Sequence, residues 1–185
     1  MCKAIKRIGI GLRTVLILLA LGLLPAIAGC EEEKIPVSVT GYNHMPYWSI
    51  RGFSVNGGSG PNVTPEAGGG KFSCCVEIPK HWRPGMKAKV SWAYDTDQGG
   101  PRPPPPQEAE VEIPEYTPEN LGSVQVHFYP DHRIKVVVSR YGITSPCGPL
   151  SDDDKLPWKT RQDLIEYYLE GKGRHERCDR LHPQP

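Results

Sequence analysis

Short runs in which apolar and polar residues alternate, flanked by glycine or proline, restrict the fold of this chain more than any other feature. An alternation of period two places one face of a strand in a core and the other face in solvent. The 20 glycines and 20 prolines interrupt the runs with turns. The runs cover residues 35–40, 48–55, 71–78, 87–94, 108–113, 124–129 and 133–138. We therefore expect a mostly β domain, sandwich-like and antiparallel, with about six or seven strands.

Three short motifs predict local details of this sheet structure. The apolar phase shifts at Arg51-Gly52, which is typical of a β-bulge. Pro84-Gly85 favours a type II turn between two strands. Pro130-Asp131-His132 joins the last two runs, which together form the clearest hairpin in the sequence.

The pattern changes in the C-terminal extension, residues 143–185. Apolar residues recur at helical spacing between Leu164 and Leu169. Pro157 suits the first turn of a helix, because its missing N–H has no intrahelical partner there. We therefore expect one α-helix over residues 157–170.

The first 29 residues have the three-part plan of a secretory signal. Four basic residues precede an apolar run from Val15 to Leu24, and small residues follow. Ile27-Ala28-Gly29-Cys30 looks like a bacterial lipobox, in which the cysteine is acylated and the chain is cut before it. We expect Cys30 to carry lipid and to begin the mature protein. A transmembrane anchor is disfavoured because the apolar run is shorter than the roughly 20 residues that cross a bilayer; an ordinary cleaved signal is the other alternative.

Removal of residues 1–29 leaves 156 residues, enough for one domain. We divide the mature chain into a lipidated tether (30–34), a β domain (35–142) and the C-terminal extension. Glu31, rather than the aspartate associated with inner-membrane retention, follows the lipid-bearing cysteine. We expect the protein on the periplasmic side of the cell envelope, with the outer membrane favoured over the inner.

Charge and motifs exclude several classes of function. Without the four basic residues of the leader, 18 of the 22 remain against 21 acidic residues, a net charge of −3 with neutral histidines. A basic stripe that would neutralise phosphates is missing, so nucleic acid is not an expected partner. No known catalytic motif contains the histidines His44, His81, His127 and His132 or the acids Asp131 and Glu77. Asp152-Asp153-Asp154 lacks the glycine and final glutamate of a calcium loop. We expect neither an enzyme nor a bound metal or cofactor.

Four cysteines remain as disulfide candidates: Cys74, Cys75, Cys147 and Cys178. An even number of cysteines in an oxidising compartment favours disulfides, and four allow three connectivities. Neighbouring side chains in a strand point to opposite faces, so a bond between Cys74 and Cys75 is the least natural pairing on geometry. On the other hand, Cys147 and Cys178 flank the expected helix and could pair with each other, which would leave Cys74 and Cys75 to bond to one another. The sequence leaves these pairings open.

Several segments of the expected β domain carry a resemblance to a known family. They are Gly68–Pro79, which contains Cys74-Cys75-Val76, then Trp82–Gly85, Phe53–Gly57 and Val136–Gly142. Together they resemble a family of small bacterial lipoproteins of unknown function, some of whose members are immunity proteins against type VI secretion lipase effectors. The resemblance covers about Val37 to Gly142.

The resemblance implies an immunity protein that binds and neutralises a type VI secretion phospholipase effector in the periplasm. Candidate contacts with that partner are Tyr47, Trp48, Trp82 and Arg83, together with the proline-rich segment 101–106. For Trp82 the alternative is a side chain that plugs the end of the β core. Two other functions stay open: a structural or assembly lipoprotein of the envelope, and a small-ligand binding module.

Overall fold

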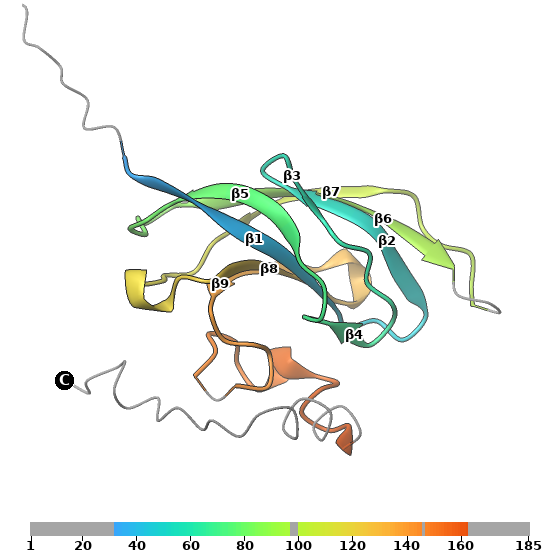
Figure 1. Cartoon of the computed structure of the whole chain (residues 1–185). Coiled ribbons are helices and arrows are strands. Elements are labelled where there is room, and N and C mark those ends of the chain that lie inside the picture. The colour runs from blue at the N-terminus through green and yellow to red at the C-terminus, as the bar shows by residue number, and fades with distance from the viewer. Residues whose placement is uncertain (1–31, 97–99, 146, 163–185) are drawn as a thin grey trace, which may run out of the picture. The chain divides into compact units, whose positions relative to one another are not determined.

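The computed structural model describes residues 32–96, 100–145 and 147–162, which all lie in the compact unit Glu32–Pro185. These residues form two β-sheets (Figure 1). One sheet has the order β4 (Ala67–Gly68), β1 (Lys34–Asn43), β8 (Ser123–Phe128) and β9 (Ile134–Ser139), with β5 (Ser73–Pro79) also paired to β1. The other has the order β3 (Gly58–Gly60), β2 (Trp48–Val55), β6 (Lys87–Thr96) and β7 (Gln107–Glu112).

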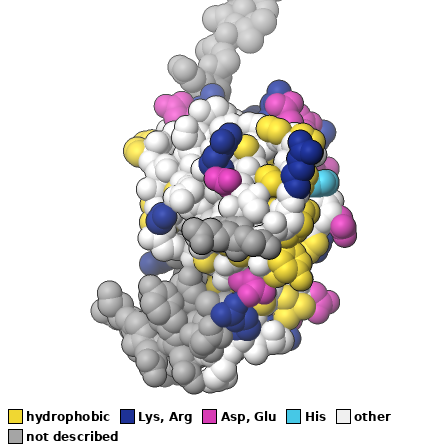
Figure 2. Space-filling view, turned by 90° about the vertical axis from the view of Figure 1, so that its right-hand side faces the viewer, with side chains coloured by type: hydrophobic (Ala, Val, Ile, Leu, Met, Phe, Trp, Pro, Cys, Tyr) yellow, Lys and Arg dark blue, Asp and Glu magenta, His cyan; other side chains and the backbone are white. Residues whose placement is uncertain are grey.

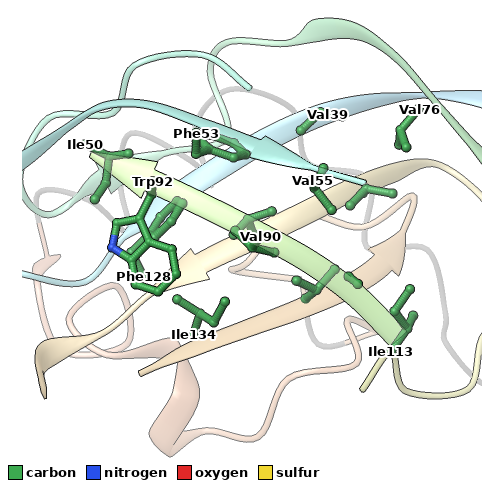
Figure 3. Close-up of a cluster of buried hydrophobic side chains, with 14 of the residues drawn as sticks. Val39, Ile50, Phe53, Val55, Val76, Val90, Trp92, Ile113, Phe128 and Ile134 are labelled. Atoms are coloured by element: carbon green, nitrogen blue, oxygen red, sulfur yellow. The ribbon is translucent and has the colours of Figure 1, made fainter. Parts of the chain in front are cut away.

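The core lies between the two sheets, and both supply its side chains (Figure 3). The ring of Phe53 from β2 meets the ring of Phe128 from β8 edge-on, with centroids 5.1 Å apart. Trp92 from β6 lies 5.9 Å from the same Phe128 ring. Full burial of a side chain of this kind stabilises the fold by roughly 1.5–3 kcal/mol. The two sheets are therefore held together mainly by aromatic and branched side chains.

The alternation in the sequence corresponds to the observed burial. Along β6 the residues Ala88, Val90 and Trp92 are buried, whereas Lys87 before them and Lys89 between the first two face solvent. The two lysines form ion pairs with glutamates of β7, the neighbouring strand. The prediction of a mostly β domain is confirmed.

The predicted local details are also present. The register between β2 and β6 shifts between Ile50 and Gly52, as expected for a bulge. Gly85 has a φ of 81°, and the N–H of Met86 donates to the carbonyl of Arg83, which closes the predicted turn. Strands β8 and β9 pair antiparallel across Pro130–His132, as a hairpin should.

One strand pairing differs from the expected antiparallel arrangement. Strands β1 and β8 are parallel, with Val39 opposite Val124 and Asn43 opposite Phe128. Parallel neighbours need a long crossover connection. Here the chain forms all the strands of the second sheet between β1 and β8. The alternation alone does not predict this order. Two short strands, β3 and β4, were not predicted either.

The predicted C-terminal α-helix is wrong. Among the described residues of this segment, Asp153–Lys155 form a 3-10 helix (η3) and residues 156–160 form turns. No α-helix of seven or more residues occurs in the described parts of the chain. The reason is tertiary: Trp158 is 1% exposed and packs on the rings of Tyr42 and His44, so the chain follows the surface of the sheet. Residues 163–170 lie outside the described residues.

A search of the described residues for a helix that is long and apolar enough to cross a membrane finds none.

Candidate functional site

The structure separates the four predicted contact residues into two pairs at opposite ends of the second sheet. Trp48 pairs with Thr96, which is the last residue of β6, and Tyr47 immediately precedes Trp48. Trp82 and Arg83 lie beside Lys87, the first residue of β6. A ten-residue strand spans roughly 30 Å. The four residues therefore do not form one surface.

Trp82 and Arg83 make contacts within the protein. The indole N–H of Trp82 donates to the carbonyl of Ile113 at 2.8 Å, and the side chain packs against the core. The guanidinium of Arg83 forms an ion pair with Glu32 at 2.5 Å. Trp82 thus fits the alternative that it plugs one end of the core.

Tyr47 and Trp48 belong to a cluster that we call the aromatic end: Tyr47, Trp48, Tyr94, Pro101 and His132. The indole N–H of Trp48 donates to the carbonyl of Pro101 at 3.0 Å, which fixes the start of the proline-rich segment. The rings of Trp48 and Tyr94 lie 5.7 Å apart. Tyr47 is 60% exposed, although it is a large hydrophobic residue. Figure 2 shows hydrophobic side chains gathered on the face that lies at the right-hand side of Figure 1.

The turn between β8 and β9 completes the aromatic end. Asp131 and His132 both have a φ of 59°, in the left-handed region that non-glycine residues seldom adopt. The hydroxyl of Tyr94 lies 2.8 Å from Nδ1 of His132 and helps to hold this turn. Burial raises the pKa of the Tyr94 hydroxyl, so it stays protonated. Backbone strain of this kind is frequent at functional sites.

Sequence reasoning missed Tyr94 and His132 as members of this cluster. The sequence pattern places Tyr94 in a core strand and His132 in a hairpin turn, and neither position by itself indicates a shared site. Tyr94 and His132 come together because one sheet packs on the other, and the sequence pattern does not predict this packing.

A second polar cluster, which we call the histidine layer, lies on the outer face of the first sheet: His44, His127, Tyr129 and Asp154. The carbonyl of Leu156 can only accept, so Nδ1 of His44 donates to it. In a neutral ring Nε2 of His44 then accepts from Nδ1 of His127, at 3.1 Å. Nε2 of His127 is left as a buried acceptor that finds no hydrogen-bond partner among the described residues.

Burial dominates the electrostatics of the histidine layer. It lowers the pKa of His44 to about 4, and it lowers the pKa of His127 well below the ordinary value, with repulsion from His44 acting in the same direction. Burial would raise the pKa of Asp154, but hydrogen bonds from Lys135 and Ser151 outweigh it and bring the pKa below its usual value. At neutral pH the two histidines are therefore neutral beside an ionised aspartate.

The described part of the C-terminal segment (residues 143–145 and 147–161) covers the histidine layer. Ile143, Leu150 and Trp158 form a second apolar cluster with residues of the first sheet. The carboxylate of Asp154 forms an ion pair with the ammonium of Lys135 at 2.5 Å. The backbone carbonyl of Asp154 accepts a hydrogen bond from the hydroxyl of Tyr129 at 3.0 Å. The layer is thus an internal support of this segment rather than an open site.

The cysteines correct a prediction. Cys74 and Cys75 form a disulfide with each other, the pairing that the argument from strand geometry disfavoured. That argument assumes a regular strand. The register between β1 and β5 shifts here, because Val37 lies opposite Val76 and Val39 opposite Ser73, so both cysteines sit in a bulge. Cys147 is also disulfide-bonded. Cys30 and Cys178 lie outside the described residues.

A glycine-lined cleft of about 380 Å³ opens beside β4. Its lining includes Gly68–Lys71 and Asn62, and the ammonium of Lys71 donates to the side-chain carbonyl of Asn62 at 3.0 Å. Within the described residues, no group of three or more histidine, cysteine, aspartate or glutamate side chains is placed to hold a metal ion. The aromatic end is the better candidate for a functional surface, because it exposes Tyr47 beside the firmly held Trp48.

Gly69→Ala in this cleft is expected to lower the free energy of unfolding by about 1–3 kcal/mol. Gly69 has a φ of 72°, and a Cβ there would lie 2.7 Å from Cε1 of the buried Tyr42 ring. Gly70→Ala is the matched control, because nothing lies within 4 Å of a Cβ at that position. Urea unfolding of both variants measures the difference, and equal midpoints would contradict the prediction.

Comparison with known families gives one match. A family model described as "Protein of unknown function (DUF3304)" matches residues 42–136. This range is 95 of the 185 residues, just over half of the chain. It contains the whole aromatic end and stops before the C-terminal segment. No match was found among curated proteins or among solved structures.

Proposed function

The chain belongs to the DUF3304 family of proteins of unknown function, and from this premise we propose that it is a lipid-anchored immunity protein of the periplasm. In this proposal Cys30 carries the lipid, and the β domain binds a phospholipase effector delivered by type VI secretion. Binding blocks the effector; the protein itself performs no chemistry.

The leader and the family resemblance support the location and the partner. The lipobox-like Ile27-Ala28-Gly29-Cys30 follows a signal-like sequence. A phospholipase works at the membrane surface. An inhibitor that is confined to the same membrane has a higher effective concentration there than one that diffuses freely.

The observation that carries the proposal is the exposure of aromatic side chains on a fixed support. Tyr47 projects into solvent while its neighbour Trp48 is held by Pro101 and Tyr94. Tyrosine and tryptophan dominate the binding energy of protein interfaces. A surface that is already ordered loses little conformational entropy when a partner binds. The aromatic end therefore suits a protein partner.

Tyr47→Ala is expected to weaken binding of the effector by roughly 30-fold, about the 2 kcal/mol that a central interface aromatic contributes. The test is co-expression of the protein with a lipase that is encoded beside its gene and directed to the periplasm. Loss of culture turbidity then measures lysis. Cells with the wild-type protein should survive, and cells with Tyr47→Ala should lyse.

Phe72→Ala is the matched control for this experiment. Phe72 is also 60% exposed, but it lies just before β5 and outside the aromatic end. Protection should survive this change. Lysis with the wild-type protein would rule out immunity against that lipase and favour a structural lipoprotein or a ligand-binding module. Equal protection by wild type and Tyr47→Ala would rule out the aromatic end as the contact surface.

A further inference from the structure

The chain just after the lipobox is bound to the body of the protein. Strand β1 begins at Lys34, which pairs with Pro79. One residue earlier, the carbonyl of Glu33 accepts from the backbone N–H of Lys80 at 2.9 Å, and the two side chains form an ion pair at 3.0 Å. Glu32 forms its ion pair with Arg83 at 2.5 Å. The expected tether is therefore docked from Glu32 onward on the connection Lys80–Met86, which we call the β5–β6 turn.

This docking leaves very little free chain between the body and Cys30. Only Glu31 separates Cys30 from Glu32. Two residue steps of extended chain span at most about 7 Å. An acyl group on Cys30 would therefore hold the β5–β6 turn close to the bilayer surface, whatever path those residues take.

We propose that in the acylated protein the β5–β6 turn rests against zwitterionic phospholipid headgroups, and that the aromatic end points away from the membrane. This inference rests on the proposed function, because it needs lipid on Cys30.

The chemistry of the β5–β6 turn fits such a surface. Lys80 and Arg83 present cations, and Glu32 and Glu33 present carboxylates next to them. The side chains of Arg83 and Glu33 remain 64% and 63% exposed in their ion pairs. Zwitterionic headgroups carry a phosphate and an ammonium group side by side, so a surface of mixed sign can pair with both. The indole of Trp82, fixed by Ile113, adds a side chain of the type that gathers at membrane interfaces.

The orientation has a consequence for the partner. The aromatic end lies at the other end of β6, roughly 30 Å from the β5–β6 turn. A protein arriving from the periplasm meets that end first, without displacing lipid. The short docked tether thus presents Tyr47 and Trp48 at a fixed height above the bilayer.

Fluorescence quenching by headgroup-labelled lipid tests the orientation. The full-length acylated protein is placed in vesicles of phosphatidylethanolamine with a minor fraction of phosphatidylglycerol and nitroxide-labelled lipid. A maleimide fluorophore is attached at His81→Cys or at Tyr47→Cys, two exposed positions, and mass spectrometry checks that only the introduced thiol is labelled. Quenching should be strong at position 81 and weak at position 47. Equal quenching, or stronger quenching at position 47, would overturn the proposal.

A spacer variant tests the role of the short tether. Insertion of about ten flexible Gly-Ser residues between Glu31 and Glu32, which span roughly 17 Å, should lower quenching at position 81 toward that at position 47. Unchanged quenching would show that the tether does not set the orientation. Cys30→Ala separates the two proposals: membrane binding that persists in this variant refutes the anchor. If membrane binding depends on Cys30 but quenching at positions 81 and 47 is equal, only the proposed orientation is refuted.

Discussion

Acidification from about pH 8 to about pH 4 is expected to lower the free energy of unfolding by about 3 kcal/mol through His44 alone. Burial lowers the pKa of His44 from 6.5 to about 4 in the folded protein. In the unfolded chain the ring takes up a proton as the pH falls below 6.5, while the folded ring stays neutral until about pH 4. Protonation therefore stabilises the unfolded state over this window, and the loss is complete once the folded ring also titrates.

The other charged groups around the two rings do not reverse this pH dependence. Burial, together with His44, also lowers the pKa of His127 well below its ordinary value, so His127 adds to the loss. Arg133 disfavours positive charge on His44 and Lys135 disfavours it on His127, whereas the carboxylate of Asp154 favours it on both rings; burial is the largest effect and keeps both pKa values low. Asp154, whose pKa lies below its usual value of 3.8, contributes stability that disappears only in stronger acid. The loss between pH 6.5 and 4 is therefore attributable to the histidines.

Urea unfolding at a series of pH values measures this effect. His44→Gln removes one titrating ring and keeps a side chain that can donate to the carbonyl of Leu156, so its stability should change less over the same window. His81→Gln is the matched control, because His81 is exposed and should leave the wild-type profile unchanged. The same steep pH dependence in His44→Gln would contradict the assignment.

Trp158→Ala is expected to lower the free energy of unfolding by about 3–5 kcal/mol, the usual cost of removing a buried tryptophan. Trp158 is 1% exposed and packs between His44, at 4.8 Å between ring centroids, and Tyr42, at 5.8 Å. Its loss leaves a cavity on the outer face of the first sheet. The C-terminal segment should then separate from that face more readily than the two sheets separate from each other.

Leu156→Ala is the control for this change. Leu156 lies two residues away in the same segment but is 43% exposed, so its truncation should alter stability by less than about 1 kcal/mol. Urea unfolding compares the two variants. Hydrogen exchange at His127 and Tyr129 should rise in Trp158→Ala, because the cover of the histidine layer is lost. Equal costs for the two truncations would show that Trp158 does not hold the segment.

The candidate surfaces show where prediction from sequence reaches its limit. Aromatic residues in or beside loops made Tyr47, Trp48 and Trp82 candidates for contact with a partner. Trp82 nevertheless lies at the other end of the second sheet and donates to the carbonyl of Ile113. Distance along the chain gives no measure of distance in a two-sheet fold, in which consecutive strands run in opposite directions.

The alternation predicts the seven longer strands and their inward faces, and turn residues predict the bulge at Arg51-Gly52 and the hairpin of β8 and β9, because these signals act over a few neighbouring residues. Three features follow instead from packing between distant segments: the parallel pairing of β1 with β8, the bond between Cys74 and Cys75, and the path of the C-terminal segment over the histidine layer. Each of these depends on which distant surface a segment meets. Local periodicity carries no information about that partner, and burial of Trp158 against the first sheet outweighs the weak preference of its own segment for a helix.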